Sequence, residues 1–203
     1  MASIANISLN LAAGVYGDPA IAAMSIVGKV MWVMFSVIIG FGQGYQPVLG
    51  FNYGAKRFDR SREAFFFMLK SCTLIGAVFA AGGYILAPVL IEHMIGYDAK
   101  AVEIGIFALR AQAVILPLLP VGVACNMSYQ SIGKSWTATF LSSLRQGLFF
   151  LPAIFLLPAL WGIRGIQLAQ PAADLGTFLA GVPFAVKFYH FLRDKEREDE
   201  REV

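Results

Sequence analysis

The chain has 203 residues, of which 58% are hydrophobic and 14% are charged, and its mean hydropathy is +0.66. Soluble domains carry roughly 25% charged residues, and a single soluble core could not bury so much apolar surface. The net charge is only +3. These values exclude an ordinary soluble domain, give no sign of a nucleic-acid partner and indicate an integral membrane protein in contact with lipid.

The first segment, at about residues 2–15, is short for a membrane helix. It offers about 13 compatible residues before a Gly/Asp/Pro turn, whereas a spanning helix needs about 20. Asn6 and Asn10 lie one helical turn apart within it, and no basic residue precedes it, which argues against a signal peptide. A short native helix and a truncated chain both fit these features, and truncation is the favoured interpretation.

Long apolar segments, divided by turns and charges, make up most of the remaining chain. Five full spans are expected at about residues 20–49, 64–90, 101–129, 137–160 and 166–188. Residues 1–190 are therefore expected to form one transmembrane bundle, and residues 191–203 a charged cytoplasmic tail. The predicted fold is an all-α integral membrane protein, a six-helix bundle whose first helix is truncated. Prolines lie inside several spans, where they bend helices, namely Pro117, Pro120, Pro152 and Pro171.

Lysine and arginine alternate between the two sides of the predicted bundle. One side carries most of them, in the loop after residue 54, the loop near residue 134 and the tail: Lys56, Arg57, Arg60, Arg62, Lys134, Arg193, Lys195, Arg197 and Arg201. The other side carries only Lys100 and Arg164. Because basic loops stay in the cytoplasm, the carboxyl terminus is predicted to be cytoplasmic and the protein to span the plasma membrane.

Ionisable residues at membrane depth are costly and point to function. Helix counting places four of them near the midplane, namely Lys29, Arg110, Arg145 and Asp174, with Glu103 nearer the outer surface. Arg145 and Asp174 reach similar depth on neighbouring antiparallel helices, so we expect them to pair, either to fix packing or to act as a gate. Three midplane cations against one anion suggest that further carboxylates come from elsewhere.

Glu103 and Arg110 are seven residues apart, which places them on one helix face where they could share a polar seam. Cys72 and Cys125 lie inside apolar runs and are predicted to be small buried residues. Enzyme interpretations fail, because "GQGYQPVLG" has no P-loop lysine and neither His93 nor His190 has metal-ligand spacing. No catalytic residue, cofactor or metal is expected.

Several ordered motifs resemble one transporter family. "YGDPAIAAMSI", "GFGQGYQPVLGFNYGAKRFDR", "YQSIGKSWTA", "LRQGLFFLPAIFLLP" and "WGIRGIQLAQPAADL" resemble successive motifs of MATE (multidrug and toxic compound extrusion) transporters, most strongly the MepA-like bacterial branch. The resemblance covers nearly the whole chain. It implies the carboxyl-terminal lobe of a twelve-helix transporter, whose partner is an amino-terminal six-helix bundle.

The resemblance also implies a function, namely export of amphipathic, cationic drugs or dyes by antiport against H⁺ or Na⁺ with alternating access. In this branch Arg145, Asp174 and Asn10 match family positions. The substrate and ion cavity, or its polar seam, is expected to involve Asn6, Asn10, Lys29, Glu103, Arg110, Arg145 and Asp174. The coupling carboxylate is expected in the amino-terminal bundle. The alternatives are a lipid-linked oligosaccharide flippase with a more cationic cavity, and an inactive fragment.

Overall fold

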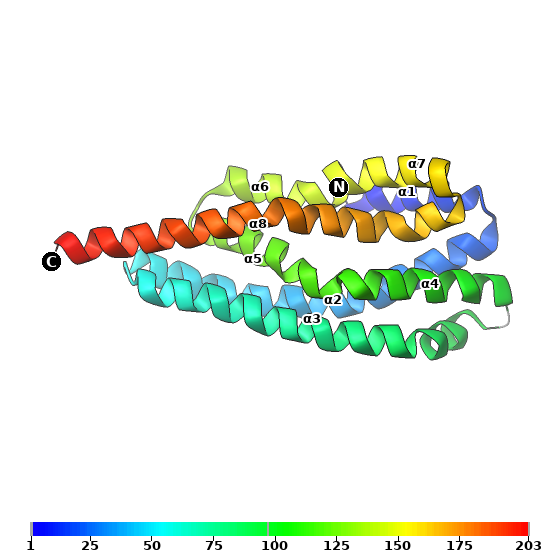
Figure 1. The fold of residues 1–203 in the computed structure, drawn as a ribbon, viewed down its shortest axis with the longest axis horizontal. Coiled ribbons are helices and arrows are strands. Elements are labelled where there is room, and N and C mark those ends of the chain that lie inside the picture. Colours follow the sequence, from blue (N-terminus) through cyan, green and yellow to red (C-terminus); the bar gives the residue numbers. More distant parts are fainter. Residues whose placement is uncertain (1, 97, 203) are drawn as a thin grey trace.

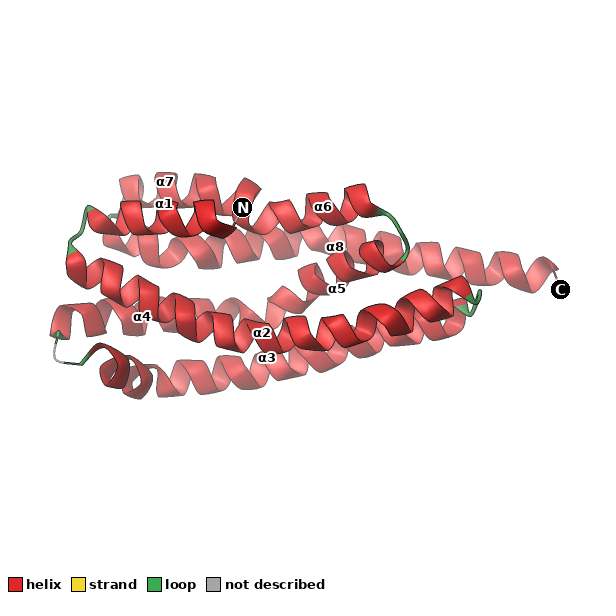
Figure 2. Cartoon of the chain, turned by 180° about the vertical axis from the view of Figure 1, so that it is seen from behind, coloured by secondary structure: helices red, strands yellow, loops and turns green. Residues whose placement is uncertain are grey.

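The computed structural model describes residues 2–96 and 98–202, and helices make up nearly all of this part of the chain (Figures 1 and 2). The elements, in chain order, are α1 (Ala2–Gly14), α2 (Asp18–Gly54), α3 (Phe58–Ile95), α4 (Ala99–Ile115), the 3₁₀ turn η1 (Leu116–Leu118), α5 (Leu119–Ser131), α6 (Ser135–Ser143), the π-helical turn η2 (Leu144–Phe149), α7 (Phe150–Trp161) and α8 (Ile163–Glu202).

These elements form six helical passes in the described residues, because α4–η1–α5 and α6–η2–α7 are each one run with an irregular centre. Five runs are long and apolar enough to cross a membrane, and α1 is a shorter helix of 13 residues. The all-α membrane fold with a short first helix is confirmed. The helices extend beyond the expected spans, most clearly α8, which continues through the charged tail, because hydropathy marks only their apolar part.

The helices lie in two layers joined by α5. In both cartoon views α1, α6, α7 and α8 lie on one side and α2, α3 and α4 on the other, with α5 slanting between them (Figures 1 and 2). The α5 helix packs against α8 and α6 in one layer and against α2 and α3 in the other. A break in the third long run, between α4 and α5, allows this crossing.

The break between α4 and α5 follows from proline. Pro117 and Pro120 lack amide hydrogens for the helical ladder; Pro117 lies inside the 3₁₀ turn, and Pro120 lies in the first turn of α5. Gly76 of α3 packs directly against this turn, since a β-carbon there would lie 3.1 Å from Pro117 Cα and 3.2 Å from the Leu116 carbonyl oxygen. A residue without a side chain therefore lets α3 approach the bend closely. By contrast, α8 stays continuous through Pro171.

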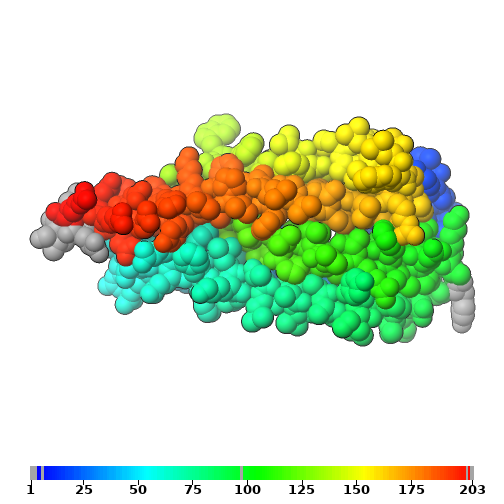
Figure 3. All heavy atoms as spheres, in the orientation of Figure 1, coloured from blue at the N-terminus to red at the C-terminus, as the bar shows by residue number. Residues whose placement is uncertain are grey.

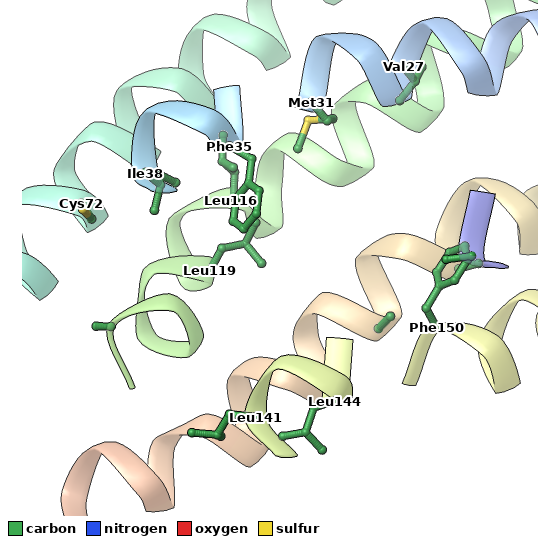
Figure 4. Packing of buried hydrophobic residues seen from close by; sticks show 14 of the residues in the cluster. Val27, Met31, Phe35, Ile38, Cys72, Leu116, Leu119, Leu141, Leu144 and Phe150 are labelled. Carbon is green, nitrogen blue, oxygen red and sulfur yellow. The ribbon is translucent and has the colours of Figure 1, made fainter. Parts of the chain in front are cut away.

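The core is a contiguous apolar cluster shared by both layers. On α2 the residues Val27, Met31, Phe35 and Ile38 recur every three or four positions and are buried, so they form one helix face. Figure 4 shows this face beside residues of η1 and α5, including Leu116. Both cysteines, Cys72 and Cys125, are fully buried and unpaired, as the sequence predicts.

The charged end of α8 projects beyond the other helices (Figure 3) and packs against the start of α3. Arg62 Nη1 lies 2.9 Å from Glu196 Oε2, and Lys56 Nζ lies 3.8 Å from Asp199 Oδ1. The charged tail is thus a helical extension that pairs with the basic connection between α2 and α3.

Candidate functional site

The centre of the candidate site is an ion pair between Arg145 and Asp174. Arg145 Nε donates to Asp174 Oδ1 at 2.6 Å, and its Nη2 donates to Oδ2 at 3.4 Å. Gln170, one turn earlier on α8, donates from Nε2 to Asp174 Oδ1 at 2.9 Å. The aspartate is only 2% exposed, so this carboxylate is buried but has three donated hydrogen bonds. The pairing expected from helix depth is present.

Local structure positions the arginine. Arg145 lies in the π-helical turn η2, where the wider turn interrupts the regular helix between α6 and α7. Such turns are rare and occur often at functional sites. The Arg145 guanidinium carbon lies 4.2 Å from the centre of the Phe35 ring of α2. The guanidinium is therefore held between a carboxylate of α8 and an aromatic face of α2, which links both layers of the fold.

The ion pair borders a cavity of about 360 Å³ at the junction of α2, α5, the α6–η2 run and α8. Aromatic and polar side chains line it together with aliphatic ones, and the aromatic and uncharged polar ones include Trp32, Phe35, Asn126, Ser142, Gln146, Thr177 and Phe178. Among the described residues, Arg145 and Asp174 are the only charged ones in this lining. Apolar walls with a few fixed polar groups are typical of sites for small amphipathic ligands.

Hydrogen bonds between side chains hold the part of α5 beside the cavity. Asn126, which lines it, donates to the Ala138 carbonyl oxygen at 2.6 Å and accepts from Gln130 at 3.2 Å. Gln46 of α2 in turn donates to Gln130 at 2.8 Å. These amides connect α2, α5 and α6, so the cavity wall is fixed across both layers.

Of the other sequence-predicted residues, four do not line this cavity, namely Asn10, Lys29, Glu103 and Arg110. Lys29 is exposed on α2, one turn before Trp32. Asn10 is exposed on α1, and the side chain of Asn6 lies outside the described residues. Lys29 and Asn10 are therefore separate from the ion pair.

Glu103 and Arg110 are also apart. Glu103 is exposed on α4, whereas Arg110 Nε donates to the Tyr84 carbonyl oxygen at 3.2 Å and its guanidinium lies 5.1 Å from the Tyr84 ring centre. Neither an ion pair nor a hydrogen bond joins the two within residues 2–96 and 98–202. Their seven-residue spacing puts them on one face, but α3 supplies the partner of Arg110.

Sequence reasoning missed several residues of the site. Gln170 could have been found, because it precedes Asp174 by one helical turn and can reach its carboxylate. Trp32 and Phe35 carry no such signal, since the ring beside Arg145 comes from a distant part of the chain. The π-helical turn could not be predicted either, because the apolar pattern of this segment fits an ordinary α-helix.

Comparisons with known proteins were made for the whole chain. The model of the MatE family matches residues 1–156. The multidrug export protein MepA of Staphylococcus aureus strain NCTC 8325 is 26% identical over 198 residues, which are 96% of this chain and 42% of that protein. The multidrug export protein MepA of Staphylococcus haemolyticus is 24% identical over 163 residues, which are 80% of this chain and 35% of that protein. The chain thus spans less than half the length of these curated relatives.

Solved structures share the fold. An outward-facing multidrug resistance MATE family transporter of the MOP superfamily has a TM-score of 0.86 and 21% identity, over 95% of this chain and 44% of that chain. A MATE crystal structure in the bent conformation has a TM-score of 0.87 and 19% identity, over 96% and 43% of the two chains. A mutant of the Vibrio cholerae MATE transporter VcmN has a TM-score of 0.86 and 19% identity, over 94% of this chain and 43% of that chain. The six-helix arrangement is therefore that of one part of such transporters.

Proposed function

The chain belongs to the MatE family, and from this premise we propose that it forms the carboxyl-terminal lobe of a multidrug exporter. The exported compounds would be amphipathic cations, moved by antiport against H⁺ or Na⁺. The multidrug export relatives support the substrate class. The observation that carries the proposal is the cavity beside the Arg145–Asp174 pair, because it offers aromatic faces and a buried carboxylate together.

A drug cation can use this cavity by replacing the arginine. Arg145 already occupies both groups that attract a cation, namely the Asp174 carboxylate and the Phe35 ring. A flat cationic drug entering beside Trp32 would compete for the same groups and displace the guanidinium. The paired and displaced arrangements are then two states with different drug affinity, which an alternating-access transporter requires.

Ion coupling belongs outside this cavity in our proposal. Among the described residues Asp174 is the only carboxylate of the lining, and Arg145 neutralises it. The carboxylate that takes H⁺ or Na⁺ would therefore lie in the partner lobe. The same charge balance favours drug export over transport of a lipid-linked oligosaccharide, because a cavity for that anionic substrate calls for an excess of cations.

The face of α2 beside the cavity suits contact with a second lobe. Gly28, Lys29, Trp32, Ser36 and Gln43 are exposed, and their spacing places them on one side of the helix. This side is more polar than the other exposed side of α2, which carries Val33, Val37 and Val48. We place the amino-terminal six-helix bundle against the polar side and lipid against the valines. Lys29 would then meet the partner lobe.

Binding of a fluorescent lipophilic cation, ethidium, to the purified chain in detergent tests the cavity. We expect binding with one site, a loss of at least tenfold in affinity for Trp32→Ala, and no change for the matched variant Trp161→Ala, whose ring is exposed on α7. Equal losses in both variants would refute the cavity as the binding site.

Transport needs a second measurement. Ethidium efflux is compared in cells that make this chain alone and in cells that also make the amino-terminal half of the S. aureus relative. We expect efflux only with both halves, together with collapse of efflux when the ion gradients are dissipated. Efflux by the chain alone would contradict the two-lobe proposal, and efflux that survives loss of both gradients would contradict antiport.

A further inference from the structure

A second cavity lies where the α5–α6 connection meets α8, apart from the drug cavity. It holds about 120 Å³ and is lined by Tyr129, Lys134, Thr137, Phe184, Lys187 and Phe191. Its two charged residues are both lysines, so its charge is positive. No lining residue is shared with the cavity beside the Arg145–Asp174 pair.

The two lysines have no carboxylate partner in the described part of the chain. The Lys134 ammonium lies 4.0 Å from the centre of the Phe191 ring, which orients it without using its hydrogen-bond donors on an anion. Lys187 lies on α8 between Phe184 and Phe191, at spacings of three and four residues that keep all three on one helix face. Both lysines can therefore turn toward one anionic group.

An apolar groove begins beside this basic cavity. It holds about 350 Å³ and is lined by Phe140, Ser143, Leu144, Gly147, Leu148 and Leu151 of the α6–η2–α7 run. Phe140 follows Thr137 of the basic cavity by one helical turn, and its ring centre lies 6.1 Å from that of Phe184. Phe140 and Leu148 are 50% and 58% exposed. The groove thus leads from the basic cavity along an outward face of the bundle.

The position of this pair of cavities matches a membrane interface. Lys134 lies in the connection at the end of the bundle, and Trp136, two residues later, is 90% exposed. Exposed tryptophans concentrate at the headgroup level of a bilayer, and lysines near helix ends reach the same level. The groove extends from Phe140 to Leu151 along the α6–η2–α7 segment, which is long and apolar enough to cross a membrane. The basic cavity therefore lies where a lipid headgroup would be, and the groove lies where an acyl chain would be.

We propose that these cavities form a binding site for an anionic phospholipid, with its phosphate between Lys134 and Lys187 and one acyl chain in the groove from Phe140 to Leu151. Lysines retained only to fix topology need no cavity between them and no adjoining apolar groove. The occupant must be an amphiphile, since a free phosphate would use only the basic half. A zwitterionic lipid would gain less from the two ammonium groups.

Native mass spectrometry of the purified 203-residue chain in detergent can measure the affinity for added dimyristoylphosphatidylglycerol, dimyristoylphosphatidylcholine and glycerol 3-phosphate. We expect the anionic lipid to bind at least tenfold more tightly than either of the others. Each lysine should contribute roughly fivefold in affinity, so Lys134→Gln/Lys187→Gln should lose about twenty-fivefold. Leu148→Asn, which puts an amide in the groove, should lower the affinity for the anionic lipid and leave the affinity for glycerol 3-phosphate unchanged.

The matched control removes the same charge at the same end of the molecule. Arg57→Gln/Arg201→Gln replaces two exposed cations and should bind the anionic lipid as the unmodified chain does. The single variants Lys134→Gln and Lys187→Gln serve if the double variant does not fold. Three results would each overturn the proposal. They are an equal loss of lipid affinity in the control variant, equal affinity for the two lipids, and an affinity for glycerol 3-phosphate as high as that for the anionic lipid.

Discussion

At the scale of single residues, the ion pair explains why an arginine and not a lysine suits position 145. The guanidinium donates to both oxygens of Asp174 and at the same time lies over the Phe35 ring. A planar fork can do both, whereas an ammonium is a point charge. If one residue of the pair is replaced by a neutral one, the charge of the other is left without its partner in an environment of low dielectric constant, which costs free energy. If both residues are replaced by neutral ones, no unpaired charge remains and this cost disappears.

This asymmetry gives a stability prediction. Asp174→Asn should lower the free energy of unfolding by roughly 3 kcal/mol, since Arg145 loses its carboxylate. The double variant Arg145→Met/Asp174→Asn should be more stable than Asp174→Asn alone, because no unpaired charge remains. Thermal melting in detergent, followed by gel filtration, measures both. Lys70→Gln, at an exposed residue of α3, serves as the control and should melt as the unmodified chain does. Additive losses in the double variant would contradict the coupling.

The two cysteines are a second prediction at this scale. Cys72 and Cys125 are fully buried, and their sulfur atoms contact Met68 and the Gly181 carbonyl oxygen. We therefore expect neither thiol to react with a maleimide in the folded protein, and both to react after denaturation in SDS. Trp136→Cys, at a position 90% exposed, should react at once under the same conditions. Labelling of the unmodified folded chain would show that these helices do not pack as described.

At the scale of elements, close approaches between helices depend on glycine. Gly165, at the start of α8, packs against the backbone of Leu157 and Pro158 of α7 so tightly that a β-carbon would overlap the Leu157 carbonyl. Gly82 of α3, by contrast, has no atom within 4 Å of the position of a β-carbon. The apolar pattern of the sequence does not distinguish these two glycines.

Alanine should therefore have opposite effects at these glycines. Gly165→Ala must displace backbone and should destabilise the protein by roughly 1–3 kcal/mol. Gly82→Ala meets nothing and should stabilise α3 by up to about 1 kcal/mol, because alanine favours the helix. Melting temperatures of the two variants in the same detergent check this pair. A lower melting temperature for both variants, or for neither, would contradict the close packing of α7 on α8.

How much the sequence could predict also differs between elements. Hydropathy and loop charges predicted the passes of the chain, and helix counting brought Arg145 and Asp174 together, because depth in a membrane follows from residue number. The same counting placed Arg110 near the midplane, with Glu103 as a candidate for a shared polar seam, whereas the Tyr84 carbonyl oxygen accepts the Arg110 hydrogen bond. Lateral contacts, such as Phe35 on Arg145, depend on how helices rotate about their axes. An apolar pattern that runs around the whole helix does not specify that rotation.

At the scale of the whole molecule, α5 couples the two layers at the cavity beside the Arg145–Asp174 pair. It contacts helices of both layers, and the cavity opens where α2, α5 and α8 meet. Pro117 in η1 and Pro120 in the first turn of α5 interrupt the regular helix after α4, so α5 takes a different direction from α4 and reaches both layers. A change in the Arg145–Asp174 pair would alter the contact between the layers directly, which is the kind of coupling that the proposed alternating-access mechanism requires.

The orientation of the molecule is the last prediction. The α2–α3 and α5–α6 connections lie at the same end as the carboxyl end of α8, while the start of α2 and the start of α4 lie at the opposite end (Figure 1). The first end carries most of the lysines and arginines outside the apolar segments, so we expect it in the cytoplasm. Ala55 and Ala99 are exposed at the two opposite ends, which makes them matched reporters.

An impermeant thiol reagent applied to intact cells should label Ala99→Cys, and Ala55→Cys only after the cells are permeabilised. The native cysteines are buried, so they should contribute no background label; the maleimide experiment on the purified protein tests this. The reverse pattern would place the basic end outside, and would move the proposed lipid site to the outer leaflet. Labelling of both variants in intact cells would mean that the chain inserts in two orientations, and the positive charges would then not be sufficient to orient it.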